Sequence, residues 1–365
     1  MSSESLQRNA GGQRNTGLDL LRLLAICMVI VLHYNYFRMG GLLGAVVPKE
    51  TNYYLGQTTE TFSIIACNLF VLISAYYLSA ANRVKVRKVV DIGLMLVFYG
   101  LLCLAVAYAF GLAPTEATGS DLMKSILTRW FVFTYVILYL IFPFLNRVIR
   151  TISRRKHLYL IWLAFIFFSV WPSVYTKVTV SDKGYGITNF ILLYLIAAYI
   201  RRYADGRKRW GVLIPAYLGS VALTLLIQLY PSYAEGSFRD FMDFVFMGKA
   251  LNYNFFLNTV SSVLLFLIFK NLSLRQSRAV TKLQGFSLSV YVIHENIFLR
   301  QWLYRVVFRS TEFYHSPVML AHLVVTVLGI FVLCAAVETL RRLLFRYTVD
   351  PLISRVRRMN LTYTA

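Results

Sequence analysis

An arginine and a histidine stand eleven positions apart in a segment that is otherwise almost entirely apolar. Arg22 is followed by the ten apolar residues Leu23 to Leu32, and His33 ends the run. Eleven residues of α-helix make about three turns, so both side chains lie on one face, roughly 16 Å apart. A charge or an imidazole in hydrocarbon costs on the order of 2.5 kcal/mol or more, and such residues usually face a bundle interior or a polar cavity. This face is therefore a candidate functional site.

These two residue types suit a reaction that needs a bound anion and a proton acceptor. Histidine exchanges protons near neutral pH and can also carry a transferred group, whereas Arg22 can pair with the acidic head of a cofactor. The alternatives are that Arg22 extends to lipid phosphates and that His33 is a hydrogen-bonded structural imidazole. The sequence from Thr16 to Asp19 matches a capping box, with Thr16 as N-cap. Asp19 is therefore expected to cap the helix or to pair with Arg22, not to act as a catalytic acid.

A second histidine follows the same pattern near the end of the chain. Tyr291 and His294 share one face of a predicted helix, and His294 lies roughly 17 Å along that helix from Leu283. This depth is about that of His33, which predicts one polar pocket containing both histidines. The alternative is that His294 bridges two helices.

The rest of the chain indicates a membrane protein with an all-α fold. It has 365 residues, of which 58% are hydrophobic and 15% are charged, and its mean hydropathy is +0.60. A soluble chain of this length could not cover so much apolar surface. We predict a polytopic bundle of about ten transmembrane helices. The predicted spans are 18–38, 58–80, 89–113, 124–146, 157–175, 186–201, 210–230, 251–271, 283–304 and 317–343.

The distribution of basic residues predicts the orientation of this bundle. If both termini are cytoplasmic, the inner segments and helix ends hold 27 of the 38 Lys and Arg residues, as the positive-inside rule requires. The net charge of +22 then reflects topology, and we expect no binding of nucleic acid. The predicted domains are a cytoplasmic tail 1–16, a transmembrane domain 17–345 and a basic cytoplasmic tail 346–365. The N-terminus lacks the charged, apolar and small-residue regions that follow one another in a cleaved signal peptide. The first span is therefore expected to remain in the protein as a membrane helix.

The four cysteines each lie within an apolar run: Cys27, Cys67, Cys103 and Cys334. No CxxC pair or Cys/His spacing typical of a metal site is present, so we expect buried thiols and no metal. In the fourth predicted span, Phe131, Tyr135 and Tyr139 recur at helical spacing. This aromatic stripe either stacks on a ligand or packs in the core.

Four stretches together resemble the integral membrane acyltransferases of the acyltransferase 3 family. They are Arg22 to His33, Asn68 to Leu78, Trp130 to Asn146 and Ser289 to His294, and they follow the family order. One departure is Ala75, where the family commonly has glycine. The resemblance implies transfer of acyl groups, mostly acetyl, from cytoplasmic acyl-CoA to sugars and polymers of the cell envelope, in the plasma membrane of a bacterium.

Residue by residue, the resemblance implies that Arg22 helps to bind acetyl-CoA or another acyl-CoA and that His33 is catalytic. His294 is a second catalytic candidate. The basic residues after the second helix would lie near the CoA phosphates, although a positive-inside loop explains them equally well; they are Arg83, Lys85, Arg87 and Lys88.

Acyl transfer from a thioester to a hydroxyl needs a general base or a nucleophile, and His33 can serve as either. The developing oxyanion needs donors, and Tyr135 is a further candidate for substrate contact. The donor candidates are Asn68, Ser74, Tyr291 and His294, and Glu60 is a candidate for orienting His33. The predicted partners are acyl-CoA, an envelope carbohydrate or lipid-linked glycan, and the bilayer.

Two other functions are compatible with the same residues. One is an envelope glycan transporter or flippase that uses the histidines as proton relays, and the other is a membrane sensor or scaffold. The acceptor, the acyl group and the oligomeric state are not specified by any motif in the chain.

Overall fold

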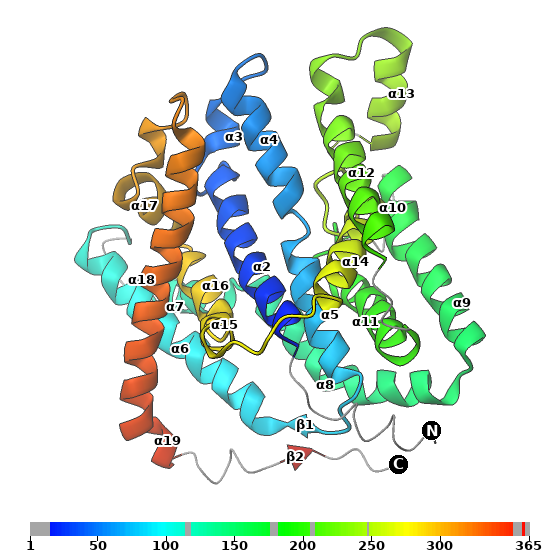
Figure 1. The fold of residues 1–365 in the computed structure, drawn as a ribbon. Helices are drawn as coiled ribbons and strands as arrows, with labels where there is room; N and C mark the ends of the chain where they lie inside the picture. Colours follow the sequence, from blue (N-terminus) through cyan, green and yellow to red (C-terminus); the bar gives the residue numbers. More distant parts are fainter. Residues whose placement is uncertain are drawn as a thin grey trace.

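The chain folds into a bundle of helices (Figure 1). The computed structural model describes residues 15–113, 118–175, 182–204, 209–246 and 248–352, and the backbone of 360–361. Strand among these residues is limited to β1 (Val84–Lys85), which pairs antiparallel with β2 (Asn360–Leu361). The prediction of an all-α fold is therefore confirmed. Most of the predicted tails 1–16 and 346–365 lies outside the described residues.

Seven described helices are long and apolar enough to cross a membrane. Three of them are built from consecutive elements joined by a local irregularity. The seven are α2 (Thr16–Asn35), α4 (Thr51–Ser63) with α5 (Ala66–Leu78), α6 (Val86–Ala109), α8 (Trp130–Thr151), α9 (Arg154–Phe165) with α10 (Trp171–Val174), α12 (Trp210–Leu229) with the 3-10 turn Tyr230–Ser232, and α18 (Met319–Tyr347).

Two predicted spans, 186–201 and 251–271, correspond to shorter helices. They are α11 (Ile187–Tyr203) with 17 residues and α14 (Phe256–Lys270) with 15, whereas a helix needs about 20 residues to cross hydrocarbon. Most of α11 is buried against α5, α8 and α9, so protein surrounds much of its surface.

The predicted span 283–304 is wrong as one continuous helix. The chain forms α15 (Arg278–Gln284), α16 (Ser287–His294) and α17 (Arg300–Trp302), with a break after His294. Buried Asn296 stabilises the break, because its Oδ1 accepts from Phe298 N at 3.0 Å and its Nδ2 donates to Ser125 Oγ at 2.9 Å. An Asn side chain that satisfies nearby polar groups offers the backbone an alternative to helix. Such backbone is tolerated at membrane depth only where protein or a cavity surrounds it.

Helix α2 is the central element of the bundle (Figure 1) and packs against α4, α5, α14, α15, α16 and α18. At Gly17 a Cβ atom would lie 2.1 Å from the carbonyl oxygen of Phe269. Glycine is therefore needed there for the close approach of α2 to the end of α14.

The N-terminal cap of α2 differs from the prediction by one residue. Asn15, and not Thr16, is the N-cap, and its Oδ1 accepts from Leu18 N at 3.1 Å. Asp19 is therefore not the third residue of a capping box, and its Oδ2 instead accepts from Thr281 Oγ1 at 3.2 Å. This hydrogen bond ties the start of α2 to α15, which lies beside the candidate site.

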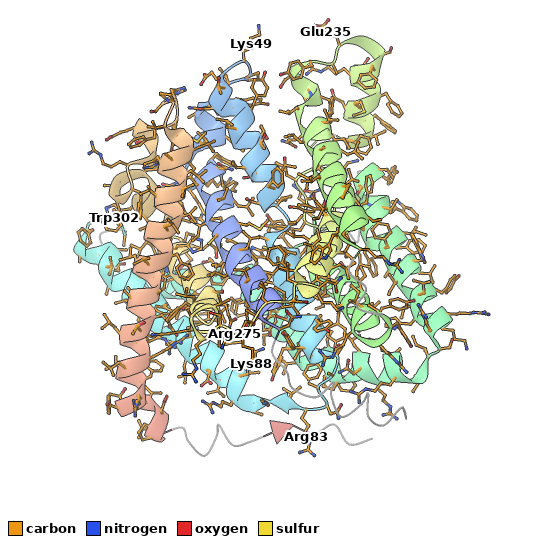
Figure 2. All side chains as sticks on the ribbon, viewed as in Figure 1. Lys49, Arg83, Lys88, Glu235, Arg275 and Trp302 are labelled. Carbon is orange, nitrogen blue, oxygen red and sulfur yellow. The ribbon has the colours of Figure 1, made fainter. Side chains whose placement is uncertain are left out.

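The two ends of the bundle differ in the helices and charged residues that lie there. Helix α2 begins and α18 ends at the lower end in Figure 1, whereas the short helices α3 (Leu42–Ala45) and α13 (Gly236–Phe246) lie at the upper end. Figure 2 places Arg83 at the lower end and Lys49 and Glu235 at the upper end. The remaining short helices are α7 (Gly119–Leu127) and α19 (Val349–Leu352).

Candidate active site

His33 on α2 and His294 at the end of α16 are hydrogen-bonded to each other. Nδ1 of His33 lies 2.8 Å from Nε2 of His294, and the ring centroids are 4.9 Å apart. His294 is fully buried, while His33 is half-buried. The two histidines that the sequence places at one depth therefore meet in the fold.

The hydrogen bonds of this pair assign its protons. Nδ1 of His294 lies 2.5 Å from the carbonyl oxygen of Val290, which can only accept, so this nitrogen carries a proton. In a neutral His294, Nε2 is then an acceptor, and Nδ1 of His33 must donate to it. Nε2 of His33 keeps its lone pair, and no hydrogen bond joins it to another described residue. The pair thus presents one imidazole nitrogen that can take a proton or attack an acyl carbon.

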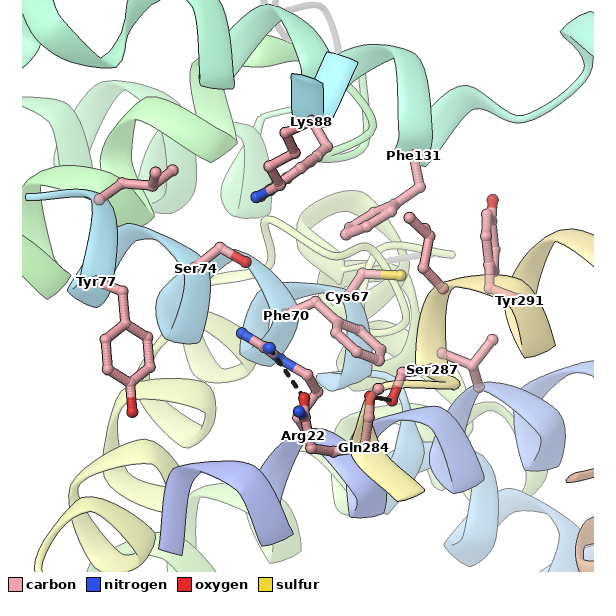
Figure 3. Close-up of a pocket in the computed structure, with 15 residues that line it drawn as sticks. Arg22, Cys67, Phe70, Ser74, Tyr77, Lys88, Phe131, Gln284, Ser287 and Tyr291 are labelled. Atoms are coloured by element: carbon pink, nitrogen blue, oxygen red, sulfur yellow. Dashed lines mark hydrogen bonds between the residues drawn. The ribbon is translucent and has the colours of Figure 1, made fainter. Parts of the chain in front are cut away.

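A cavity of about 450 Å³ extends from Arg22 between α2, α5, α8 and α16 (Figure 3). Its lining includes Val29 and Tyr291, which lie one helical turn before His33 and His294 respectively. Neither histidine lines this cavity, so it is not the predicted pocket containing both histidines. The lining residues are Arg22, Val29, Cys67, Phe70, Ser74, Tyr77, Leu78, Lys88, Phe131, Tyr135, Gln284, Gly285, Ser287, Leu288 and Tyr291.

Arg22 is held at the mouth of this cavity by α15. Its Nη1 donates to Gln284 Oε1 at 3.1 Å, and the Gln284 carbonyl accepts from Ser287 Oγ at 2.8 Å (Figure 3). Arg22 is half-buried, so a ligand can reach it from the cavity and from the protein surface. A cation fixed in this position suits an anionic part of a ligand.

Lys88 of α6 adds a second cation from the opposite wall. Its amine donates to the Tyr135 hydroxyl and lies 4.8 Å and 4.6 Å from the ring centroids of Tyr135 and Tyr139. The aromatic stripe on α8 therefore orients a lysine, while Phe131 and Tyr135 also line the cavity. Two cations on two helices make this end of the cavity electropositive.

A buried ion pair lies next to the histidines. Arg129 is only 1% exposed, and its Nε and Nη2 donate to the Val292 carbonyl at 3.3 Å and 3.1 Å. Its Nε also lies 3.9 Å from Glu295 Oε2. Glu295 Oε2 and the Tyr291 hydroxyl are buried without a hydrogen-bond partner among the described residues. Polar atoms of this kind are usually satisfied by water or a ligand.

The remaining predicted site residues divide into those at the cavity and those that hold the fold together. Ser74 and Tyr291 line the cavity. Asn68 donates to the Tyr253 carbonyl at 2.8 Å and accepts from Asn189 Nδ2 at 3.1 Å, so its amide connects three segments. Glu60 Oε2 accepts from Asn35 at 3.0 Å. The hydrogen bond that orients the His33 ring is donated by its Nδ1 to Nε2 of His294, and not to Glu60.

The basic residues predicted to lie near CoA phosphates occupy different positions. Lys88 lines the cavity, and both Arg87 and Lys88 line a second cavity beside it. Arg83 is exposed beside β1 and lines neither of these two cavities.

Sequence reasoning missed two residues at the site. Arg129 had a detectable signal, because it is a charge within a predicted span. Gln284 had none, because a glutamine at a helix end is unremarkable until α15 is seen to pack on α2.

Comparison with known proteins identifies the family of the chain. The profile of the family described as an acyltransferase domain, Acyl_transf_3, matches residues 15–339. No significant match was found among curated proteins or among solved structures. The matched region covers most of the chain and runs from the start of α2 into α18. The chain therefore belongs to the acyltransferase 3 family of membrane acyltransferases.

Proposed function

We propose that this chain moves an acyl group, expected to be acetyl, from cytoplasmic acyl-CoA to a hydroxyl of an extracytoplasmic sugar or envelope polysaccharide. We place it in the plasma membrane of a bacterium. One observation carries the proposal. The hydrogen-bonded pair of His33 and His294 lies one helical turn beyond a cavity whose other end holds Arg22 and Lys88. This arrangement suits a donor with an anionic head and a reactive thioester at the far end.

The charge distribution supports an orientation with both termini in the cytoplasm. Helix α2 begins and α18 ends at the lower end of the bundle (Figure 1). Arg83 and Lys88 lie toward that end (Figure 2), and the positive-inside rule favours such an end for the cytoplasm. The mouth of the cavity beside Arg22 would then open toward cytoplasmic acyl-CoA.

In the proposed reaction, Nε2 of His33 accepts the proton of the acceptor hydroxyl while the hydroxyl oxygen attacks the thioester carbonyl carbon. The C–S bond breaks, and the departing CoA thiolate takes the proton back from the imidazolium. In the second route, Nε2 attacks the thioester carbonyl carbon and the C–S bond breaks, which releases the CoA thiolate. The acceptor hydroxyl then attacks the acyl carbon, the N–C bond to Nε2 breaks, and the hydroxyl proton is passed to the thiolate. Both routes use the same lone pair. The Tyr291 hydroxyl, which has no hydrogen-bond partner among the described residues, supports a role as donor to the developing oxyanion.

Replacing Arg22 with glutamine is expected to raise the KM for acyl-CoA about tenfold, with a smaller effect on kcat. A hydrogen bond to a charged group contributes about 1.5–3 kcal/mol, and glutamine keeps the polarity of the site without its charge. Initial rates at varied acyl-CoA concentration measure the effect. Arg278→Gln, at an exposed position of α15 outside the cavity lining, is the control. An unchanged KM in Arg22→Gln would remove Arg22 from donor binding.

The function is tested by incubating membranes that contain the chain with radiolabelled acetyl-CoA. We expect label in surface polymer, dependent on the chain, and mass spectrometry of the polymer identifies acceptor and acyl group together. Absence of labelled product with acetyl-, succinyl- and longer acyl-CoA would refute the proposal. Glycan movement that needs no acyl-CoA would instead support the transporter alternative.

A further inference from the structure

Arg300 is a positive charge beside the histidine pair that the proposed reaction does not use. It begins α17, six residues after His294, and is half-buried. Its charge lies within electrostatic range of both His33 and Glu295. Glu295 forms its ion pair with Arg129, and no hydrogen bond or ion pair joins the guanidinium of Arg300 to another described residue. The donors of this guanidinium therefore remain available.

The loop that follows His33 is held against the segment that begins with α17. Side-chain hydrogen bonds join the two: Gln301 Nε2 donates to the Arg38 carbonyl at 3.2 Å, and Arg305 donates to the Met39 and Phe37 carbonyls at 2.8 Å and 2.6 Å. Arg38 and Arg300 therefore belong to two segments that are in direct contact.

This contact lies at the end of α2 that is opposite to Arg22. His33 is in the last turn of α2, and Figure 2 places Trp302 of α17 well above Arg83, which marks the lower end of the bundle. His33 is half-buried and does not line the cavity that contains Arg22. A second ligand can therefore reach the His33 ring from the side of α17, which we place toward the outside.

Arginines are disfavoured on the outer side of a membrane protein, and most of those on the described segments there are paired. Arg129 pairs with Glu295, Arg239 with Asp243 and Arg309 with Glu312, while Arg305 donates to backbone carbonyls. Arg300 has no such partner, and the guanidinium of Arg38 lies over the Phe37 ring at 5.3 Å without an ion pair to a described residue. A half-buried cation without a counter-charge is costly. These two arginines therefore indicate an anionic ligand.

Exposed aromatic rings lie beside Arg38. Tyr36 and Phe37 are 40% and 55% exposed, and their ring centroids are 4.9 Å apart. Adjoining apolar surface next to polar groups is typical of a binding surface. A ligand for this place therefore combines an anionic group with apolar faces, as an acidic sugar does.

We propose that Arg300 and Arg38 bind an anionic group of the acceptor, so that this chain acylates an acidic sugar polymer and not a neutral one. Carboxylate and phosphate both match the planar donors of a guanidinium. The bound anion would hold the acceptor on the outer side of His33 with a neighbouring hydroxyl at Nε2, while the thioester approaches from the cavity that contains Arg22. This inference rests on the proposed function.

The composition of the acylated product gives the first test. Mass spectrometry of the surface polymer is expected to find a carboxylate or a phosphate in the repeat unit that carries the acyl group. An acylated polymer with neither group would overturn the inference and leave the proposed function intact. If no polymer is acylated, the proposed function fails together with the inference.

Matched acceptors prepared from this polymer give the second test. The polymer is deacylated with mild base, and one portion is then neutralised, either by reducing its carboxylates to alcohols or by removing its phosphate substituents. The wild type is expected to show a KM at least about tenfold higher for the neutralised polymer, because charge-assisted hydrogen bonds are lost. The treatment that raises the KM identifies the anion, and equal KM values for all the polymers would overturn the inference.

Replacing Arg300 with glutamine tests the residue itself. The KM for the charged polymer is expected to rise at least about tenfold, with no change for the neutralised polymer or for acetyl-CoA, and the double variant Arg38→Gln/Arg300→Gln should no longer distinguish the two polymers. The unchanged KM for acetyl-CoA shows that the variant is folded. The control is Arg309→Gln, at an exposed arginine that pairs with Glu312.

Two results with these variants would overturn the inference. An unchanged KM for the charged polymer in Arg300→Gln would remove Arg300 from acceptor binding. An equal loss of kcat with both polymers would instead place its charge at the reacting acyl group.

Discussion

Replacing His33 with alanine is expected to reduce acyl transfer by about 10²–10⁴-fold, the usual contribution of a positioned general base. The variant removes Nε2, whose lone pair is available because Nδ1 makes the hydrogen bond to His294. Binding of acyl-CoA should be retained, because Arg22 and Lys88 lie at the other end of the cavity. Transfer of radiolabelled acetyl groups in membranes and CoA binding by purified protein measure the two effects separately.

Substitutions at His294 distinguish a positioning role from direct chemistry. His294→Gln offers a side-chain oxygen to Nδ1–H of His33, whereas His294→Leu offers no acceptor. We expect His294→Gln to keep more activity than His294→Leu, with little change in the KM for acyl-CoA in either variant. His315→Ala, at an exposed site that contacts Glu50, is the matched histidine control. Full activity in His294→Leu would contradict the assigned role, and full activity in His33→Ala would remove His33 from the chemistry.

Replacing Arg129 with methionine is expected to lower the free energy of unfolding by about 3–5 kcal/mol, the usual cost of removing one partner of a buried ion pair. Arg129 is 1% exposed and holds the Val292 carbonyl two residues before His294. Its loss would leave Glu295 buried without its cation. The unfolding temperature of the purified protein in detergent, followed by tryptophan fluorescence, measures the effect.

The double variant Arg129→Met/Glu295→Gln tests the cause of this destabilisation. If the unpaired carboxylate is responsible, the double variant should unfold at a higher temperature than Arg129→Met alone. Arg275→Met, at an exposed loop position, controls for loss of an arginine elsewhere. A wild-type unfolding temperature in Arg129→Met would show that the ion pair does not stabilise the fold.

The properties that depend on local periodicity could be predicted from the sequence. Helix geometry places Arg22 and His33 on one face, and apolar composition requires helices that bury their backbone within a membrane. The all-α fold followed from these patterns, whereas the family was identified by the resemblance of four stretches of sequence. Helix boundaries were less predictable, because Asn15 caps α2 in place of Thr16 and because α16 ends where buried Asn296 binds Ser125.

The contacts of the site could not be read from the sequence, because they join residues far apart in the chain. His33 and His294 are separated by 261 positions, and Glu60, which the sequence offered as the orienting group, instead bonds Asn35.

The amino-acid sequence by itself determined that this protein is a helical membrane acyltransferase with an arginine and a histidine on one face of its first helix. Only the tertiary structure decided which nitrogen of His33 is available, which residues hold Arg22 and Arg129, and that Arg300 lies close to the histidine pair. The reason is physical. Helix periodicity is set by neighbouring residues, whereas a hydrogen bond between two helices depends on packing that fixes distance and orientation to within a fraction of an ångström.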